Sequence, residues 1–108
     1  MSHSAACNAV LVYLSELGCL VWRNEVGLFY DRRGTPRKIG VTGQTDVSGI
    51  SPDGIAIGVE VKTGAKPTRT DHQKKWAAAV IAHKGKYAVA HIRNGIDWKQ
   101  QLKQDLDL

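Results

Sequence analysis

The stretch from Ile55 to Lys62 alternates almost perfectly between aliphatic and other side chains, and this pattern restricts what the chain can fold into. Residues two apart on a β-strand lie on the same face, so this alternation is typical of a strand with two different faces. One face carries Ile55, Ile57, Val59 and Val61, and the other carries Ala56, Gly58, Glu60 and Lys62. The sequence therefore predicts a strand that buries its aliphatic face and holds two opposite charges together on its other face.

Helical patterns precede and follow this strand. Residues 5–17 place apolar side chains at helical spacing, with Ser4 as the expected N-cap and Gly18 just beyond the end. Thr70 is expected to open a second helix that runs to about Lys84. The inward stripe of this second helix is expected to contain Trp76, Ala77, Val80 and Ile81.

Shorter β-prone runs at 20–23, 28–30 and 86–93 complete the pattern, and the tail from Ile96 is again helical in its spacing. A chain of 108 residues builds one modest core, which leaves no room for a second domain. The sequence therefore predicts a single α/β domain over residues 1–108. We expect a mixed sheet flanked by helices, in an α-β-β-β-α-β order.

The balance of charge indicates the kind of partner. Lys and Arg number 15 against 10 Asp and Glu, which gives a net charge of +5 and favours a polyanionic partner.

No apolar run approaches the ~20 residues that span a bilayer, so no membrane association is expected. The two cysteines, Cys7 and Cys19, form no C-x-x-C pair, so we expect buried free thiols. Because the first residues also lack the basic segment of a secretory signal, we expect an intracellular protein.

Three short elements in the middle of the chain carry groups suited to metal-dependent chemistry. They are the stretch from Gly40 to Asp46, the pair Glu60 and Lys62, and Gln73 at the start of the second helix. An Asp and a Glu on neighbouring strands can hold Mg²⁺ between their oxygens, with a backbone carbonyl near Glu60 as a further ligand. Lys62 would then position or activate the attacking water, which is the chemistry of phosphodiester hydrolysis.

Each element also has a simpler structural interpretation. Glu60 and Lys62 are equally compatible with the solvated face of an edge strand, where such a pair contributes well under ~1 kcal/mol. Gln73 follows Thr70 at the spacing of a helix capping box. Gly43 fits an ordinary turn glycine. Singly, then, these residues do not establish a site.

Their joint order is more specific. In sequence order the chain carries Trp22-Arg23-Asn24, a glycine-led aspartate from Gly43 to Asp46, Glu60-Val61-Lys62-Thr63, Thr70 to Gln73 followed by Trp76, and Tyr87-Ala88-Val89 followed by Arg93. This order resembles the VRR-NUC family, a branch of the PD-(D/E)xK nuclease superfamily. The likeness extends over about residues 7–97, which is nearly the whole chain.

The resemblance implies a restriction-endonuclease-like α/β core with a defined site. Asp46, Glu60 and the backbone carbonyl of Val61 would bind Mg²⁺ or Mn²⁺, Lys62 would assist the attacking water, and Gln73 would support the site. Stand-alone members of the family resemble dimeric resolvases of four-way DNA junctions. We therefore expect a homodimer that acts on branched DNA.

The same resemblance leaves two alternatives open. The domain fused into the Fanconi-associated nuclease acts on flaps, so a flap or replication-fork nuclease is the rival enzyme. Family members usually carry a glutamate near the start of the first helix as a further metal ligand, but residues 4–8 contain no acid. Glu25 is a possible replacement without support of its own. The missing acid makes a catalytically silent DNA-binding module the second alternative.

Basic residues concentrate on both sides of these acids. Ten of the 15 lie in residues 23–38 and 62–75, which predicts a basic groove with acids at its floor. No base-reading motif accompanies them, so we expect contacts to the DNA backbone and its shape. The expected contact residues are Arg23, Asn24, Arg32, Arg33, Arg37, Lys38, Gly43, Lys66, Arg69 and Lys74. Trp98, on the polar tail, is the expected dimer contact.

Overall fold

The computed structural model of the protein describes residues 1–25, 27–65 and 68–108, which form three helices and six strands. In chain order they are α1 (His3–Glu16), β1 (Leu20–Arg23), β2 (Gly27–Tyr30), β3 (Pro36–Ile39), β4 (Val47–Ile50), β5 (Ala56–Lys62), α2 (Asp71–Ala82), β6 (Lys86–His91) and α3 (Trp98–Asp105). This is the mixed α/β architecture that the sequence predicts.

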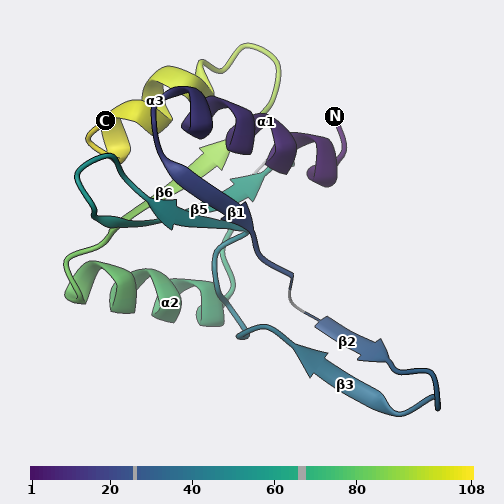
Figure 1. The fold of residues 1–108 in the computed structure, drawn as a ribbon. Coiled ribbons are helices and arrows are strands. Elements are labelled where there is room, and N and C mark those ends of the chain that lie inside the picture. Colours follow the sequence, from purple (N-terminus) through teal and green to yellow (C-terminus); the bar gives the residue numbers. More distant parts are fainter. Residues whose placement is uncertain (26, 66–67) are drawn as a thin grey trace.

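Four strands form the main sheet, in the order β1-β4-β5-β6. The first three pair antiparallel, whereas β5 and β6 run parallel because α2 connects them as a crossover. Helices α1 and α3 cover one face of the sheet, and α2 covers the other (Figure 1). The predicted mixed sheet flanked by helices is therefore confirmed.

Strand β5 is the middle of this structure. Ile57, Val59 and Val61 are buried, and they belong to the apolar cluster that α1 and α3 complete. The opposite face of the strand is also covered, and Glu60 keeps only 2% of its surface exposed. The interpretation of Glu60 as part of a solvated edge strand is therefore wrong, because β5 is hydrogen-bonded on both sides.

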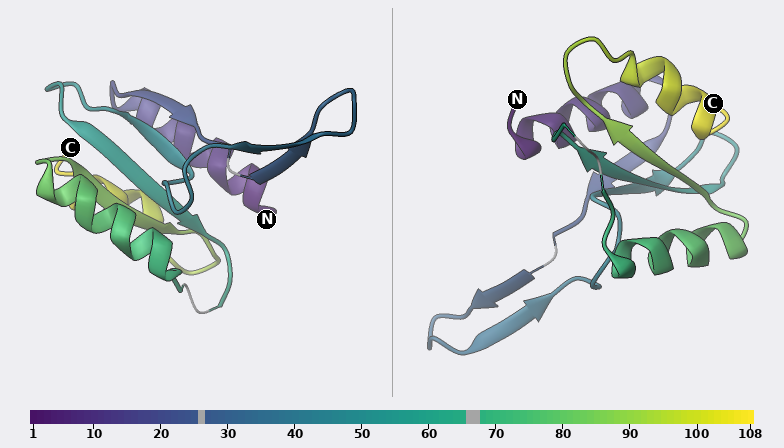
Figure 2. Two further views of the ribbon diagram at one scale, coloured as in Figure 1. Left: turned by 90° about the horizontal axis from the view of Figure 1, so that it is seen from below. Right: turned by 180° about the vertical axis from the view of Figure 1, so that it is seen from behind.

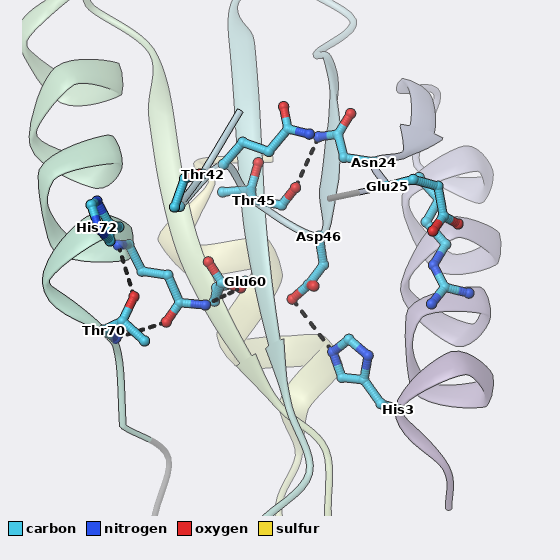
Figure 3. Close-up of a pocket in the computed structure, with 13 residues that line it drawn as sticks. His3, Asn24, Glu25, Thr42, Thr45, Asp46, Glu60, Thr70 and His72 are labelled. Atoms are coloured by element: carbon cyan, nitrogen blue, oxygen red, sulfur yellow. Dashed lines mark hydrogen bonds and ion pairs between the residues drawn. The ribbon is translucent and has the colours of Figure 1, made fainter. Parts of the chain in front are cut away.

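Helix α1 begins earlier than its apolar pattern indicates. Ser2 is the N-cap, because its Oγ accepts a hydrogen bond from the amide of Ala5 at 3.1 Å. The prediction that Ser4 is the N-cap is wrong. The Ser4 hydroxyl instead accepts a hydrogen bond from Arg23 Nη1 at 2.8 Å. The first turn of the helix therefore includes His3, which lies at the end of the helix nearest β5 (Figure 3).

Helix α2 has the predicted N-terminus and a less apolar inner face than predicted. The Gln73 amide donates to Thr70 Oγ1 at 3.2 Å, and Gln73 Oε1 accepts from the Thr70 amide at 2.9 Å, which confirms the capping box. Trp76 and Val80 are half-buried, but Ile81 is 59% exposed and does not belong to the inward stripe. This short helix packs on β5 and β6 of the sheet.

Strands β2 and β3 form a separate hairpin that projects from the rest of the molecule (Figures 1 and 2). At its tip, Asp31 Oδ1 accepts hydrogen bonds from the amides of Arg33 and Thr35, both at 2.9 Å. Leu28, Phe29 and Tyr30 are exposed, so these side chains of the hairpin do not belong to the core. We refer to residues 27–39 as the arm.

Three further expectations concern residues outside the site. Cys7 and Cys19 are buried free thiols, as expected. The Trp98 ring packs edge-on against Tyr13 with centroids 5.7 Å apart and so joins α3 to α1, while its expected role at a dimer contact stays a prediction. Within the described part of the chain, no helix combines the length and the apolar character needed to cross a membrane.

Candidate functional site

Two adjoining hollows lie where the start of α1, the loop before β4, the end of β5 and the first turn of α2 meet. Figure 3 shows the residues that line the first of them. Each has a volume of about 450 Å³. Asp46, Glu60 and Gln73 line both hollows, and Lys62 lines the second. The four residues that the sequence placed in one site are therefore gathered at one place.

Pairing between β4 and β5 positions the two acids. Val47 pairs with Val59 in antiparallel register. Asp46, which precedes Val47, therefore lies beside Glu60, which follows Val59. The Val61 amide donates to Asp46 Oδ2 at 2.8 Å, which holds this carboxylate against β5. The backbone carbonyl of Asp46 accepts from the Asn24 amide at 2.8 Å, which fixes its other side. These two contacts with the backbone therefore fix both the position and the orientation of Asp46.

A chain of hydrogen bonds joins the remaining predicted residues. Gln73 Nε2 donates to Glu60 Oε1 at 3.0 Å, and Lys62 Nζ donates to Gln73 Oε1 at 3.2 Å. The same Gln73 oxygen also accepts from the amide of Thr70. The capping and functional interpretations of Gln73 are thus compatible, because one side chain closes the helix end and holds Glu60 and Lys62 in place.

Glu60 is the most perturbed acid of the site. Burial is the largest cause that raises the pKa of its carboxyl group, the neighbouring Asp46 adds to the rise, and the resulting pKa is about 8. Lys62 and Arg69 oppose the rise without cancelling it. Among the described residues, Glu60 Oε2 is buried with no hydrogen-bond partner. A divalent cation fits this arrangement, because it would ligate the unpartnered oxygen and favour the ionised form of both acids.

His3 is the functional candidate that the sequence analysis missed. Its Nε2 lies 3.1 Å from the Val61 carbonyl oxygen and 3.5 Å from Asp46 Oδ2 (Figure 3). Together with Cys7, His3 and Asp46 offer ligand atoms that all lie within 4.8 Å of one another. A signal was present, since His3 is four residues before Cys7 and therefore shares its inward helix face.

His3 lies in the first turn of α1, the part of the chain in which residues 4–8 contain no acid. The proposed replacement, Glu25, lies on the rim of the first hollow and is exposed. Among the described residues, Glu25 is not part of the group of potential metal ligands around Asp46. The geometry thus favours His3 over Glu25 for the position that the sequence left without an acid.

Three expected DNA contacts lie at the first hollow, and each also has a structural role. Arg23 donates to Ser4, and Asn24 Nδ2 donates to the carbonyl of Thr45 at 2.8 Å. Gly43 has a φ of +85°, and a Cβ at this position would lie 2.4 Å from the His72 carbonyl oxygen. A glycine is therefore required for the loop to pack this closely on α2.

The other expected DNA contacts that the structure describes do not line either hollow. Arg32, Arg33, Arg37 and Lys38 are exposed on the arm, with Arg37 Nε 3.4 Å from Asp31 Oδ2. The Arg69 guanidinium lies over the Tyr87 ring, and Lys74 is exposed on α2. Lys66 lies outside the described residues. The predicted basic groove is therefore only partly formed, with Arg23 and Lys62 at the hollows and four basic residues on the arm.

Comparison with protein-family models and with curated proteins finds no match for this chain. The functional argument therefore depends on the geometry of the site.

The raised pKa of Glu60 predicts a specific dependence of stability on pH. The folded-state pKa of about 8 exceeds the ordinary value of 4.5 for this carboxyl group, so folding favours the protonated acid, and this contribution is lost as pH rises from about 4.5 to about 8. In the presence of a chelator, we expect Glu60→Gln to be more stable than wild type by about 1–3 kcal/mol at pH 9. At pH 5 the two proteins should have nearly equal stability.

Urea denaturation at both pH values measures this difference directly. The substitution keeps an oxygen that can accept from Gln73 Nε2, so it removes the charge with little change of shape. A difference between the two proteins that is the same at pH 5 and pH 9 would contradict a raised pKa at Glu60.

Proposed function

We propose that the protein is a metal-dependent endonuclease that hydrolyses phosphodiester bonds in DNA, with Mg²⁺ or Mn²⁺ as its cofactor. The observation that carries the proposal is the buried Glu60 carboxylate, placed beside Asp46 and tied through Gln73 to Lys62. A fold does not bury an unpaired acid without cost, and such groups concentrate at functional sites. The resemblance to the VRR-NUC family supports the same assignment.

In this proposal Asp46, Glu60 and the Val61 carbonyl hold the cation. The ion would neutralise charge on the phosphate and lower the pKa of a bound water. The protein holds the other groups of the site in position. The Val61 amide fixes Asp46, and Gln73 fixes both Glu60 Oε1 and Lys62 Nζ.

Lys62 is the group that would approach the reacting atoms. Its ammonium group donates to Gln73 Oε1, and further protons remain to orient the attacking water or a phosphate oxygen. Because Gln73 Oε1 also accepts from the amide at the start of α2, the direction of this lysine depends on the helix cap. The cap would thereby couple the fold of α2 to catalysis.

The arm would hold the DNA on either side of the bond that is cut. The arm begins just after the hollow-lining residues Arg23–Glu25 and ends just before the hollow-lining residues Thr42–Asp46. Its exposed cations are Arg32, Arg33, Arg37 and Lys38. Such residues bind phosphates without reading bases, which suits an enzyme selective for DNA structure.

We further propose that the substrate is a branched DNA, of which the four-way junction is the leading candidate, and that the protein acts as a homodimer. A junction is cut at two points related by a two-fold axis, and a dimer with two sites matches that symmetry. Flap or replication-fork cleavage is the alternative enzyme, and DNA binding without cleavage is the alternative outside catalysis.

Cleavage of labelled DNA tests the proposal. We expect wild type to cut a four-way junction with Mg²⁺ or Mn²⁺, and Lys62→Ala and Asp46→Asn to lower the rate at least about a hundredfold. Lys103→Ala, an exposed lysine of α3, is the matched control and should cut normally.

Substrates of equal length distinguish the alternatives. Faster cleavage of a flap or fork than of the junction would favour the rival enzyme. Binding of all substrates without cleavage, under both metals, would support the silent module and contradict the proposed function.

The arm should contribute to DNA affinity rather than to chemistry. In an Asp46→Asn background, changing both Arg32 and Arg33 to Ser should weaken junction binding and reduce the slope of log affinity against log salt by up to about two. Lys103→Ser in the same background serves as the control. Unchanged affinity and slope in fluorescence anisotropy titrations would exclude the arm from the DNA contact.

The proposed homodimer can be measured without DNA. Sedimentation of the wild-type protein at micromolar concentration should give twice the mass of the chain. A single species with the monomer mass, both alone and on a saturating amount of junction, would contradict the dimeric proposal.

A further inference from the structure

Three atoms from different elements converge at the start of α1. His3 Nε2 comes from the first turn of the helix, Asp46 Oδ2 from the residue before β4, and the Val61 oxygen from the backbone of β5. The almost fully buried Glu60 carboxylate, whose Oε2 has no hydrogen-bond partner among the described residues, lines the same hollow. The cluster therefore combines an imidazole nitrogen with carboxylate and carbonyl oxygens.

We propose that His3 is a further ligand of the metal at Asp46, Glu60 and Val61, and that this nitrogen makes the site prefer a divalent transition-metal ion such as Mn²⁺ over Mg²⁺. The inference rests on the proposed metal site and goes beyond it, because it adds a ligand and the class of ion. It also identifies a role for the N-terminal turn of α1.

The separations between these atoms agree with ligation of one ion. Adjacent ligands of an octahedral ion at about 2.1 Å are separated by about 3 Å. The observed separations from His3 Nε2 are 3.1 Å to the Val61 oxygen and 3.5 Å to Asp46 Oδ2. Small movements would bring all three atoms to ligating positions, with the ion between Nε2 and its two oxygen neighbours.

The identity of the donor atoms sets the preference for the ion. Mg²⁺ prefers an all-oxygen environment, whereas imidazole favours first-row transition metals. A site with one imidazole and several oxygens suits Mn²⁺ and the later divalent ions better than Mg²⁺. His3 thereby shifts the selectivity of a site that would otherwise consist of oxygens alone.

Cys7 is near this cluster but is not expected to be a ligand. Its Sγ lies 3.8 Å from His3 Nε2 and 3.9 Å from His3 Nδ1, and the side chain is completely buried in the apolar cluster. Burial also raises the pKa of the Cys7 thiol, so the thiolate needed for ligation is disfavoured. A sulfur-rich zinc site is therefore not supported.

Pulsed electron paramagnetic resonance of bound Mn²⁺ tests the inference without requiring cleavage. The full chain, free of any affinity tag, is stripped of metal and loaded with less than one equivalent of Mn²⁺ at about pH 8, where imidazole is neutral. A ligating histidine gives ¹⁴N modulation of the manganese signal. The loss of free Mn²⁺ signal in the same samples gives the dissociation constant.

Two substitutions at His3 separate a nitrogen ligand from a structural contact. His3→Gln should remove the ¹⁴N modulation and raise the Mn²⁺ dissociation constant at least about tenfold. His3→Glu should also remove the modulation, but it should retain metal binding and reduce the preference for Mn²⁺ over Mg²⁺ at least about tenfold. The matched control is His83→Gln, because His83 is exposed at the other end of α2 and also contacts a backbone carbonyl.

The outcomes distinguish this inference from the proposed function. Mn²⁺ binding that depends on Asp46 and Glu60, but shows no ¹⁴N modulation in wild type, would overturn the role of His3 and leave the proposed metal site intact. Modulation that survives in His3→Gln would also overturn it. Absence of any Mn²⁺ binding that is sensitive to Asp46→Asn would overturn the proposed function together with the inference.

Discussion

The rest of the structure depends on the burial of the Glu60 carboxylate in the central strand. An acid on a strand that is paired on both sides and covered by α2 loses its hydration, which is costly unless the fold supplies partners. Gln73 supplies one hydrogen bond, and Asp46 adds a second acid rather than a cation. The result is an acid with a raised pKa and, among the described residues, no hydrogen-bond partner for Oε2, and a divalent cation is the partner that would satisfy both carboxylates.

Each surrounding element has a position that follows from this arrangement. The β4–β5 register brings Asp46 beside Glu60, and the capped end of α2 aims Gln73 at the sheet. The early start of α1 brings His3 to the same hollow. Because these contacts come from helix caps and strand pairing, the site is held by the most regular parts of the fold, which favours preorganised chemistry.

Much of this arrangement follows from local sequence patterns. The alternation at 55–62 predicts β5, and the spacing of Thr70 and Gln73 predicts the helix cap, because both patterns depend on neighbours in sequence. The depth at which Glu60 is buried does not follow from local sequence patterns, because it depends on which strands and which helix cover β5. His3 was missed for a related reason: its contact with Val61 joins residues 58 positions apart, and no apolar pattern marks it. The β-prone run at 28–30 predicts the first strand of the arm, but the pairing of this strand with β3 and its separation from the main sheet are set by tertiary contacts.

The central claim is that Asp46, Glu60 and Val61 form the binding site of a divalent cation. Anomalous X-ray diffraction from crystals grown with Mn²⁺, recorded on both sides of the manganese absorption edge, tests this claim by locating the ion directly. The account predicts one strong peak within ligand distance of both carboxylates and the Val61 carbonyl oxygen. A fully loaded crystal with its manganese peak elsewhere, or with no peak between the two acids, would contradict it.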